Sequence, residues 1–381
     1  MNLRDGGVCI PHGFRAAGVA AGIKGSGELD LALIVSEEEA TAAAGVFTTN
    51  RSTAAPVQVS RARLAGGRAR GVVINSGCAN AMTGPRGVAD AELMAASAAA
   101  AVGVGSEEML VCSTGLIGAY LPMEAVLRGI EEAAGRLGEG DEAAARAIMT
   151  TDTRPKRAAL VHPDGWSVGG IAKGAGMMAP RMATMLAVIT TDARLSAADL
   201  DVALRETTEG TFNSITVDGD TSTNDTVLVF ANGRCGVAPS LDAFGEALHA
   251  VCAALAKAIV SDGEGATKLV RVRISGGISA EQAKLAARAV AESLLVKTAL
   301  YGADANWGRV AAAIGRSGAE AAFDRLSISM GGVGILLEGI PAPQAVLARA
   351  RDALGGEEVE IACDLQAGSA SAEMLTTDLS P

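Results

Sequence analysis

Residues 173–191 read KGAGMMAPRMATMLAVITT, and the two halves of this stretch differ in character. The second half, residues 184–191, is a run of apolar and β-branched side chains that predicts a buried strand. The first half contains two glycines and Pro180, which allow a bent or strained approach to that strand. We therefore expect Thr184 to place a hydroxyl at the start of a buried strand, directly after the small residue Ala183.

Strands and helices are expected to alternate on both sides of this stretch. The predicted strands are Gly71–Asn75, Thr226–Phe230 and Lys268–Ser275, and the first should open into a polar loop at Ser76–Asn80. The predicted helices are Ala89–Val102, Leu241–Val260 and Ser279–Thr298. Such alternation predicts an α/β architecture, and a length of 381 residues favours two domains.

The composition argues against several classes of partner. A formal net charge of -11 and a pI near 4.9 repel phosphate backbones and anionic lipid. The N-terminal residues lack a basic region followed by an apolar stretch, and no run of about 18 uncharged apolar residues occurs elsewhere. Six cysteines are scattered without a CxxC pair, which is typical of reduced thiols. We expect a cytoplasmic protein that binds neither nucleic acid nor membrane.

None of the three histidines has the surroundings of a catalytic base. His12 follows a proline, His162 precedes one, and His249 lies in the helix expected at residues 241–260. No Gly-x-Ser-x-Gly elbow and no HExxH pair accompanies them. A catalytic triad that depends on histidine is therefore not expected.

Nucleotide and metal sites are not expected either. The chain has no GxxxxGK[ST] motif, and its paired glycines lack the spacing of a dinucleotide-binding loop. Asp218, Asp220 and Asp225 offer carboxylates without the spacing and the glycine of a calcium loop. We expect no metal and no tightly bound cofactor.

A threonine can act as a nucleophile without histidine if the peptide bond before it is cut. The freed α-amine then takes the proton from the hydroxyl of its own residue. An α-amine has an unperturbed pKa of about 7.7 to 8.0, so a large share of it is neutral at cytoplasmic pH. It is also tethered beside its nucleophile, so the proton transfer is intramolecular. The pair Ala183-Thr184 suits this chemistry, but a turn followed by a core strand explains the same pattern.

Several short motifs occur together and in a fixed order along the chain. They are Gly13–Gly18, Gly45–Asn50, Asn75–Gly77, Ser113–Gly115, Met149–Thr153, Lys173–Leu186, Ile215–Asp225, Gly263–Lys268 and Asn306–Arg309. Each motif is modest, but the ordered set is specific. The chain resembles the family of ornithine acetyltransferases, also called bifunctional glutamate N-acetyltransferases, from Gly13 to its end.

The resemblance implies a fold and an activity. The fold is a layered α-β-β-α sandwich of the N-terminal-nucleophile-like aminopeptidase type over residues 1–270, with a smaller α/β domain at 271–381. The precursor cuts itself between Ala183 and Thr184, and the two fragments stay together, two of each in a tetramer. Thr184 then takes acetyl from N-acetylornithine, or from acetyl-CoA as an alternative donor, and passes it to glutamate in arginine biosynthesis.

The same resemblance assigns the site residues. It implies that the Thr114 hydroxyl and the Gly115 backbone N–H hold the oxyanion. Substrate contacts carry over onto Thr150, Lys173 and Thr184, and onto Glu264. Lys173 suits a substrate carboxylate, and Glu264 suits the amine of ornithine.

The residues alone leave plainer alternatives open. Ser113–Gly115 could be a turn, Lys173 an exposed loop lysine, and Glu264 a solvated turn residue. The run Asp218–Asp225 either supports the site or satisfies its own backbone. Asn306–Arg309 opens a helix and forms either packing or a wall of the active site.

Two departures from the family pattern bear on the function. Cys78 stands where the family has asparagine, and family members continue beyond Asp378–Leu379 with a tail that brings an asparagine and a threonine to the substrate. Two alternative functions follow. One is an N-terminal-nucleophile amidase or aminopeptidase that uses water as acceptor. The other is an inactive paralogue that binds acylated amino acids or only assembles.

Overall fold

The structure, a computed structural model, describes residues 2–177 and 185–380. Contacts within the chain divide it into two compact units. The first unit comprises Met1–Asn213 and Asp220–Ile259, and the second comprises Ser214–Gly219 and Val260–Pro381. The sequence analysis placed the division after residue 270, whereas the structure divides the chain near residue 260 and gives the segment 214–219 to the second unit.

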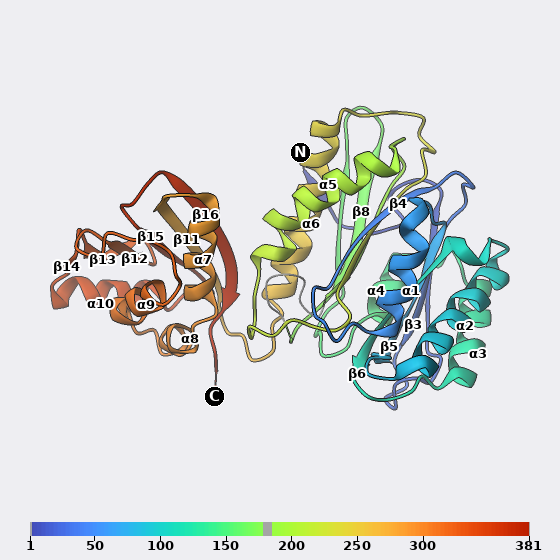
Figure 1. Cartoon of the computed structure of the whole chain (residues 1–381), viewed down its shortest axis with the longest axis horizontal. Helices are drawn as coiled ribbons and strands as arrows, with labels where there is room; N and C mark the ends of the chain where they lie inside the picture. The colour runs from blue at the N-terminus through green and yellow to red at the C-terminus, as the bar shows by residue number, and fades with distance from the viewer. Residues whose placement is uncertain (1, 178–184, 381) are drawn as a thin grey trace. The chain divides into compact units, whose positions relative to one another are not determined.

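The first unit contains two sheets (Figure 1). Sheet A has the strand order β1-β7-β8-β9-β10-β4 and consists of β1 (Leu3–Arg4), β7 (Lys156–Val161), β8 (Ser167–Lys173), β9 (Leu186–Thr191), β10 (Thr226–Ala231) and β4 (Ala42–Phe47). Sheet B has the order β2-β3-β5-β6 and consists of β2 (Phe14–Val19), β3 (Leu31–Ser36), β5 (Gly71–Cys78) and β6 (Met109–Leu116). The pairs β9–β10 and β5–β6 are parallel, and the other neighbours are antiparallel.

The two sheets pack face to face and bury one core between them. Alternate residues of a strand point to opposite faces, so Val72 and Ile74 of β5 face sheet A while Val73 faces away from it. Ile171 of β8 and Val188 of β9 meet them from the other side, in the same core cluster. Both faces of these strands are therefore buried, which explains why apolar residues form nearly continuous runs in the sequence.

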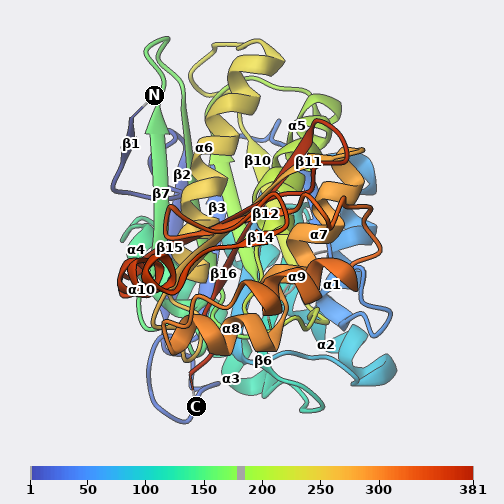
Figure 2. The same ribbon diagram turned by 90° about the vertical axis from the view of Figure 1, so that its left-hand side faces the viewer.

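Helices cover the two outer faces of this sheet pair. They are α1 (Ala55–Arg63), α2 (Gly84–Val102), α3 (Met123–Gly135), α5 (Ala197–Gly210) and α6 (Leu241–Val260), with 3₁₀ turns at Leu64–Gly66, Ser106–Glu108 and Phe212–Ser214. Helix α4 (Asp141–Ala147) instead contributes Ala144 and Ala145 to the core between the sheets. Met94 of α2 and Val126 of α3 pack on the outer face of sheet B. Helix α5 contacts β4 and β10, and Leu255 of α6 packs against Gly170 of β8 (Figures 1 and 2). The predicted α-β-β-α sandwich is confirmed.

The second unit is a smaller α/β unit built on sheet C. Its strand order is β14-β13-β12-β15-β11-β16, from β14 (Ile340–Pro341), β13 (Val333–Leu337), β12 (Ser327–Met330), β15 (Glu358–Asp364), β11 (Leu269–Gly277) and β16 (Ala370–Thr377). The helices are α7 (Ala280–Ala291), α8 (Leu294–Tyr301), α9 (Trp307–Gly315) and α10 (Gln344–Ala353). Val272 and Ile274 of β11 pack with Val290 of α7 and Ile314 of α9 in its core.

The structure corrects two of the predicted elements. Strand β5 continues to Cys78, because Ser76 and Gly77 pair with β6, so the polar loop expected from Ser76 begins later. The single helix expected over residues 279–298 is two helices. The first ends at Ala291, and Ser293 caps the second, since its Oγ accepts a hydrogen bond from the Val296 amide.

Of the described residues, helix α6 alone is long and apolar enough to cross a membrane by length and composition. The sequence analysis had found no such stretch. Half of its most apolar window is buried inside the structure. Phe244, Leu248 and Leu255 on this helix are completely buried, which is the pattern of a helix in a protein core.

Lys297 is a cation buried in the second unit, at 2% exposure. Its Nζ donates to Thr376 Oγ1 at 3.0 Å and to Thr377 Oγ1 at 2.9 Å, and so joins α8 to the end of β16. Burial lowers the pKa of Lys297 from 10.5 to about 8, although the charges of Asp378 and Asp218 partly oppose this shift. The folded state therefore binds this proton more weakly than the unfolded chain.

The stability of the protein relative to its Lys297→Met variant should rise with pH between about 8 and 10.5. Below this pH range Lys297 is charged in both the folded and the unfolded protein, so the folded state bears the full free-energy cost of burying the charge. As pH rises, only the unfolded chain retains the proton, and the penalty of about 3 kcal/mol disappears. Chemical denaturation of both proteins across this range measures the difference, and a difference independent of pH would contradict the prediction.

Candidate active site

Strand ends from both sheets of the first unit bring several predicted residues together. Thr114 lies near the end of β6 on the face that carries Leu110 and Cys112 into the core between the sheets. Lys173 is the last residue of β8, on the same face as Ile171. Because these faces oppose each other, two residues that are far apart in sequence become neighbours across the sandwich.

Lys173 is the centre of this cluster and is only 1% exposed. Its Nζ donates to Thr150 Oγ1 at 2.8 Å and to Thr114 Oγ1 at 3.3 Å. Three residues that the family resemblance assigned to the site are therefore in direct contact. The alternative that Lys173 is an exposed loop lysine is wrong.

Asp152 supplies the negative charge beneath the lysine. It accepts hydrogen bonds from Lys156 Nζ at 2.6 Å and from the Gly174 amide at 2.7 Å, while its other oxygen accepts from the Thr150 amide at 3.0 Å. Lys173 Nζ lies 4.0 Å from the same carboxylate. Burial alone would raise the pKa of Asp152, but Lys173 and Lys156 outweigh it and hold the pKa below its ordinary value. Asp152 is therefore a permanent anion.

Gly115 follows Thr114 in a conformation that requires glycine. Its φ is +127°, and a Cβ added there would lie 2.3 Å from the backbone carbon of Gly77 on the neighbouring strand. The residue is exposed, although Thr114 beside it is buried. The backbone of Gly115 is thus open to a small molecule next to a buried hydroxyl, which is the arrangement that an oxyanion hole needs.

Asp225 fixes the start of β9, the strand that follows Thr184 in sequence. Its Oδ1 accepts a hydrogen bond from the Met185 amide at 3.1 Å, and the residue is completely buried. Burial raises the pKa of Asp225 well above its ordinary value, and the Met185 amide and the charge of Lys173 oppose this only in part. Burial therefore disfavours the charged form of Asp225 relative to an exposed carboxylate.

The residues before Asp225 connect the ends of several strands. Asn224 Nδ2 donates to the carbonyl oxygens of Ala79 and Ser113, at 2.7 and 2.9 Å. Thr48 Oγ1 donates to the carbonyl of Ser222 at 2.6 Å. This part of the Asp218–Asp225 run therefore braces the site instead of satisfying only its own backbone.

The other predicted residues belong to the second unit or lie outside the described residues. Ala183 and Thr184, the predicted cleavage pair and nucleophile, lie outside the described residues. Glu264 is an exposed residue of the second unit. Asn306 caps α9 through a hydrogen bond from the Arg309 amide at 3.1 Å, so the prediction that it opens a helix is confirmed.

The sequence analysis missed Asp152 and Lys156 as members of the site. Asp152 lies within the motif Met149–Thr153, which was a possible signal, but its partner Lys156 belongs to no motif. Two charged residues four positions apart are common on protein surfaces, and only the structure shows that both are buried.

The described residues offer no histidine and no metal ligands to the cluster. His162 stacks on Trp166 with ring centroids 4.5 Å apart, at the end of β7 opposite to Lys156. Within residues 2–177 and 185–380, no group of three or more His, Cys, Asp or Glu side chains could hold a metal ion. The polar groups of the cluster are hydroxyls, ammonium groups, carboxylates and backbone amides.

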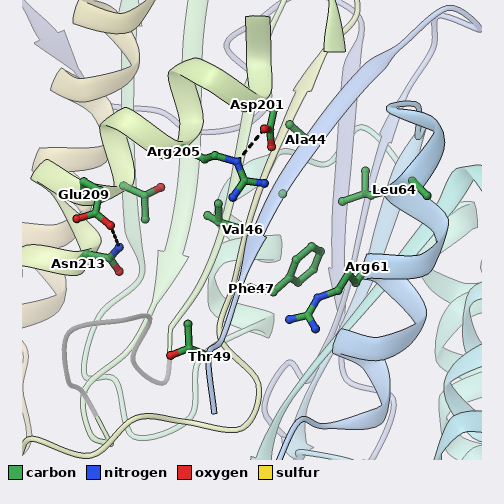
Figure 3. Close-up of a pocket in the computed structure, with 13 residues that line it drawn as sticks. Ala44, Val46, Phe47, Thr49, Arg61, Leu64, Asp201, Arg205, Glu209 and Asn213 are labelled. Carbon is green, nitrogen blue, oxygen red and sulfur yellow. Dashed lines mark hydrogen bonds and ion pairs between the residues drawn. The ribbon is translucent and has the colours of Figure 1, made fainter. Parts of the chain in front are cut away.

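A separate pocket of about 780 Å³ lies beside edge strand β4, between α1 and α5 (Figure 3). Phe47, Arg61 and Arg205 are among its lining residues. Arg205 pairs with Asp201 and Glu209 with Asn213, so its polar groups largely satisfy one another. None of the residues predicted for catalysis or substrate binding lines this pocket.

The fold and the cluster together define a class of protein, a layered α-β-β-α enzyme with a buried lysine that contacts two threonine hydroxyls. Comparison with known sequences is more specific, because the ArgJ family profile matches residues 15–381. The chain belongs to the ArgJ family, as the resemblance in the sequence predicted.

Individual relatives match over the whole chain. The arginine biosynthesis bifunctional protein ArgJ of Mycolicibacterium paratuberculosis is 48% identical and covers 99% of this chain and 95% of its own. The protein of the same name from Symbiobacterium thermophilum is 50% identical and covers 100% and 97%. A solved structure, the ornithine acetyltransferase of Mycobacterium tuberculosis in complex with ornithine, is 53% identical over 47% of this chain and 97% of its own, with a TM-score of 0.46.

Proposed function

We propose that this protein moves acetyl from N-acetylornithine to glutamate in arginine biosynthesis, through an acetyl ester on Thr184. The observation that carries the proposal is the buried Lys173 ammonium in contact with the hydroxyls of Thr114 and Thr150. Lys173 lies opposite Leu186 in the antiparallel pair β8–β9, beside the first described residues after Thr184. Relatives named for arginine biosynthesis cover the whole chain, which favours transfer to glutamate over hydrolysis and over an inactive paralogue.

The first step is cleavage of the precursor. Thr184 Oγ attacks the Ala183 carbonyl, and the amide bond breaks to give an ester and the free Thr184 amine. Water then hydrolyses the ester and releases the Ala183 carboxylate and the Thr184 hydroxyl. Small Ala183 leaves its carbonyl accessible. The hydrogen bond from Met185 to buried Asp225 anchors the chain directly after the nucleophile. We expect the two fragments to stay together, because β8 and β9, which lie on either side of the cut, are neighbours in one sheet.

Acetyl transfer then proceeds in two half-reactions. Thr184 Oγ attacks the acetyl carbonyl of N-acetylornithine, its proton passes to the Thr184 amine, and ornithine leaves with its α-amine protonated. The amine of glutamate attacks the resulting ester, and N-acetylglutamate leaves as Thr184 recovers its proton. Each half-reaction passes through a tetrahedral oxyanion.

Thr114 and Gly115 are suited to hold this oxyanion. Thr114 Oγ1 accepts a hydrogen bond from Lys173, so its own proton remains available to donate. The nearby ammonium polarises that hydroxyl in a site with little water, where such donors are most effective. Gly115 offers the neighbouring backbone N–H from an exposed position that tolerates no side chain.

Substrate carboxylates are attracted by the net charge of the cluster. The ammonium groups of Lys173 and Lys156 share the single carboxylate of Asp152, so cations outnumber anions in this ion-paired group. We assign Thr150 and Lys173 to substrate binding on this ground. The family resemblance adds Glu264, an exposed carboxylate of the second unit, as the partner of the ornithine amine.

The remaining assignments follow from the family resemblance. We propose that acetyl-CoA is an alternative donor, that no metal or bound cofactor takes part, and that two of each fragment form a tetramer. We also propose that the enzyme works in the cytoplasm. Gel filtration and acetyl-CoA turnover by purified protein test the assembly and the donor.

Purified protein should consist of two fragments, the C-terminal one beginning at Thr184. Thr184→Ala should remain a single chain, because the attacking oxygen is gone, whereas Thr184→Ser should still cleave. Intact mass and N-terminal sequencing make the measurement. A full-length chain in active wild-type enzyme would contradict self-cleavage.

Thr114→Ala should lower kcat about a hundredfold or more and leave KM nearly unchanged, because an oxyanion donor is worth roughly 2.7 to 4 kcal/mol. Thr114→Ser keeps the hydroxyl and should retain most of the activity. Steady-state kinetics of the cleaved enzyme separate the two constants. An effect confined to KM would make Thr114 a substrate-binding residue instead.

The rate of acetyl transfer should rise with pH to a plateau set by a single group, the α-amine of Thr184. Its pKa should lie near or below the free value of about 8, since the nearby positive charge of Lys173 favours the neutral amine. Variants of His12, His162 and His249 should keep this pH dependence. If one of them folds but loses both transfer and the rising limb, histidine is the base.

A further inference from the structure

The loop between β2 and β3 is folded around a single buried carboxylate. Asp30 is completely buried, and its two oxygens accept hydrogen bonds from four consecutive backbone amides. The donors are Ala21 at 2.7 Å, Gly22 at 3.1 Å, Ile23 at 2.6 Å and Lys24 at 2.8 Å. Hydrogen bonds to a charged acceptor are roughly twice as strong as neutral ones, so the backbone at Lys24 is held firmly.

This loop carries Lys24 to the proposed oxyanion site. A Cβ added to Gly77 would lie 3.1 Å from Lys24 Cγ, so the lysine stem passes directly over that glycine. Gly77 pairs with Gly115 in the parallel register of β5 and β6. The stem of Lys24 therefore lies one strand away from the backbone group that we assign to the oxyanion.

The ammonium group of Lys24 is only half-buried and is engaged by an uncharged partner. Its Nζ donates to the carbonyl oxygen of Leu29 at 2.9 Å. Burial lowers the pKa of Lys24, while the charges of Asp30, Glu28 and Asp152 oppose this shift. Lys173, by contrast, is buried between two hydroxyls and a carboxylate. Of these two cations, Lys24 can change its partner more easily.

The two proposed substrates carry opposite charges at the ends of their side chains, where a cation such as Lys24 would distinguish them. N-acetylornithine and glutamate share an α-carboxylate, but the donor side chain ends in an ammonium and the acceptor side chain in a carboxylate. We infer that Lys24 binds the side-chain carboxylate of the acceptor glutamate and so determines specificity in the second half-reaction. This inference rests on the proposed function. Lys24 exchanges the Leu29 carbonyl for a charged partner when glutamate enters, and keeps the carbonyl while the donor is bound.

The test compares the two half-reactions in Lys24→Met and Lys24→Gln. Both variants keep much of the stem over Gly77 and lose the charge. We expect kcat/KM for glutamate to fall about 10- to 100-fold through KM, because a charge-assisted hydrogen bond to the acceptor is lost. Release of ornithine from N-acetylornithine in a single turnover should stay within about twofold of wild type. Lys24→Arg should restore most of the glutamate KM.

Arg128→Gln is the matched control. It removes one positive charge from the same unit, at an exposed residue of α3 paired with Glu124, and should change neither half-reaction. Equal losses in both half-reactions of the Lys24 variants, or no loss, would overturn the assignment. Wild-type enzyme that releases ornithine but fails to acetylate glutamate would instead overturn the proposed function, and this assignment with it.

Discussion

A buried ammonium group is the constraint on which the first unit depends. An unpaired charge in a protein interior costs several kcal/mol, so Lys173 requires partners wherever the fold places it. Asp152 provides the opposite charge and is itself fixed by the amides of Thr150 and Gly174. The lysine then contacts Thr114 on the other sheet. One ion therefore holds the end of β8, the segment at 150–152 and the end of β6 in register.

The same constraint gives the site its chemistry. A hydroxyl that accepts from an ammonium keeps its own proton for another acceptor, so holding Lys173 in place also orients Thr114. Asp225 and Asn224 complete the frame, because they bind the Met185 amide and the carbonyls of Ala79 and Ser113. In the proposed mechanism, structural and catalytic roles therefore depend on the same hydrogen bonds.

Periodicity predicted the elements that local sequence controls. The strand predicted at Thr226–Phe230 and the helix predicted at Leu241–Val260 are both present. Both are long apolar segments, and such segments are buried whether they form a strand or a helix. The break at Ser293 was missed, since apolar spacing continues across it and only the cap reveals the new helix. In the site, Lys156 was missed for a different reason. Burial of a charge depends on which segments pack around it, and no local pattern in the sequence records that.

The acidic chain makes a local source of positive charge necessary. With a net charge of -11, the protein as a whole repels substrates that carry carboxylates. At the strand ends, two buried lysines, Lys173 and Lys156, share one carboxylate, that of Asp152, so cations outnumber anions in this ion-paired group. In the proposed reaction, a fixed cation of this kind serves the α-carboxylate that N-acetylornithine and glutamate have in common. A site that must accept one substrate with a side-chain ammonium and another with a side-chain carboxylate needs a second cation that can change its partner. Lys24 has that property, because it is half-buried and donates to the neutral carbonyl of Leu29.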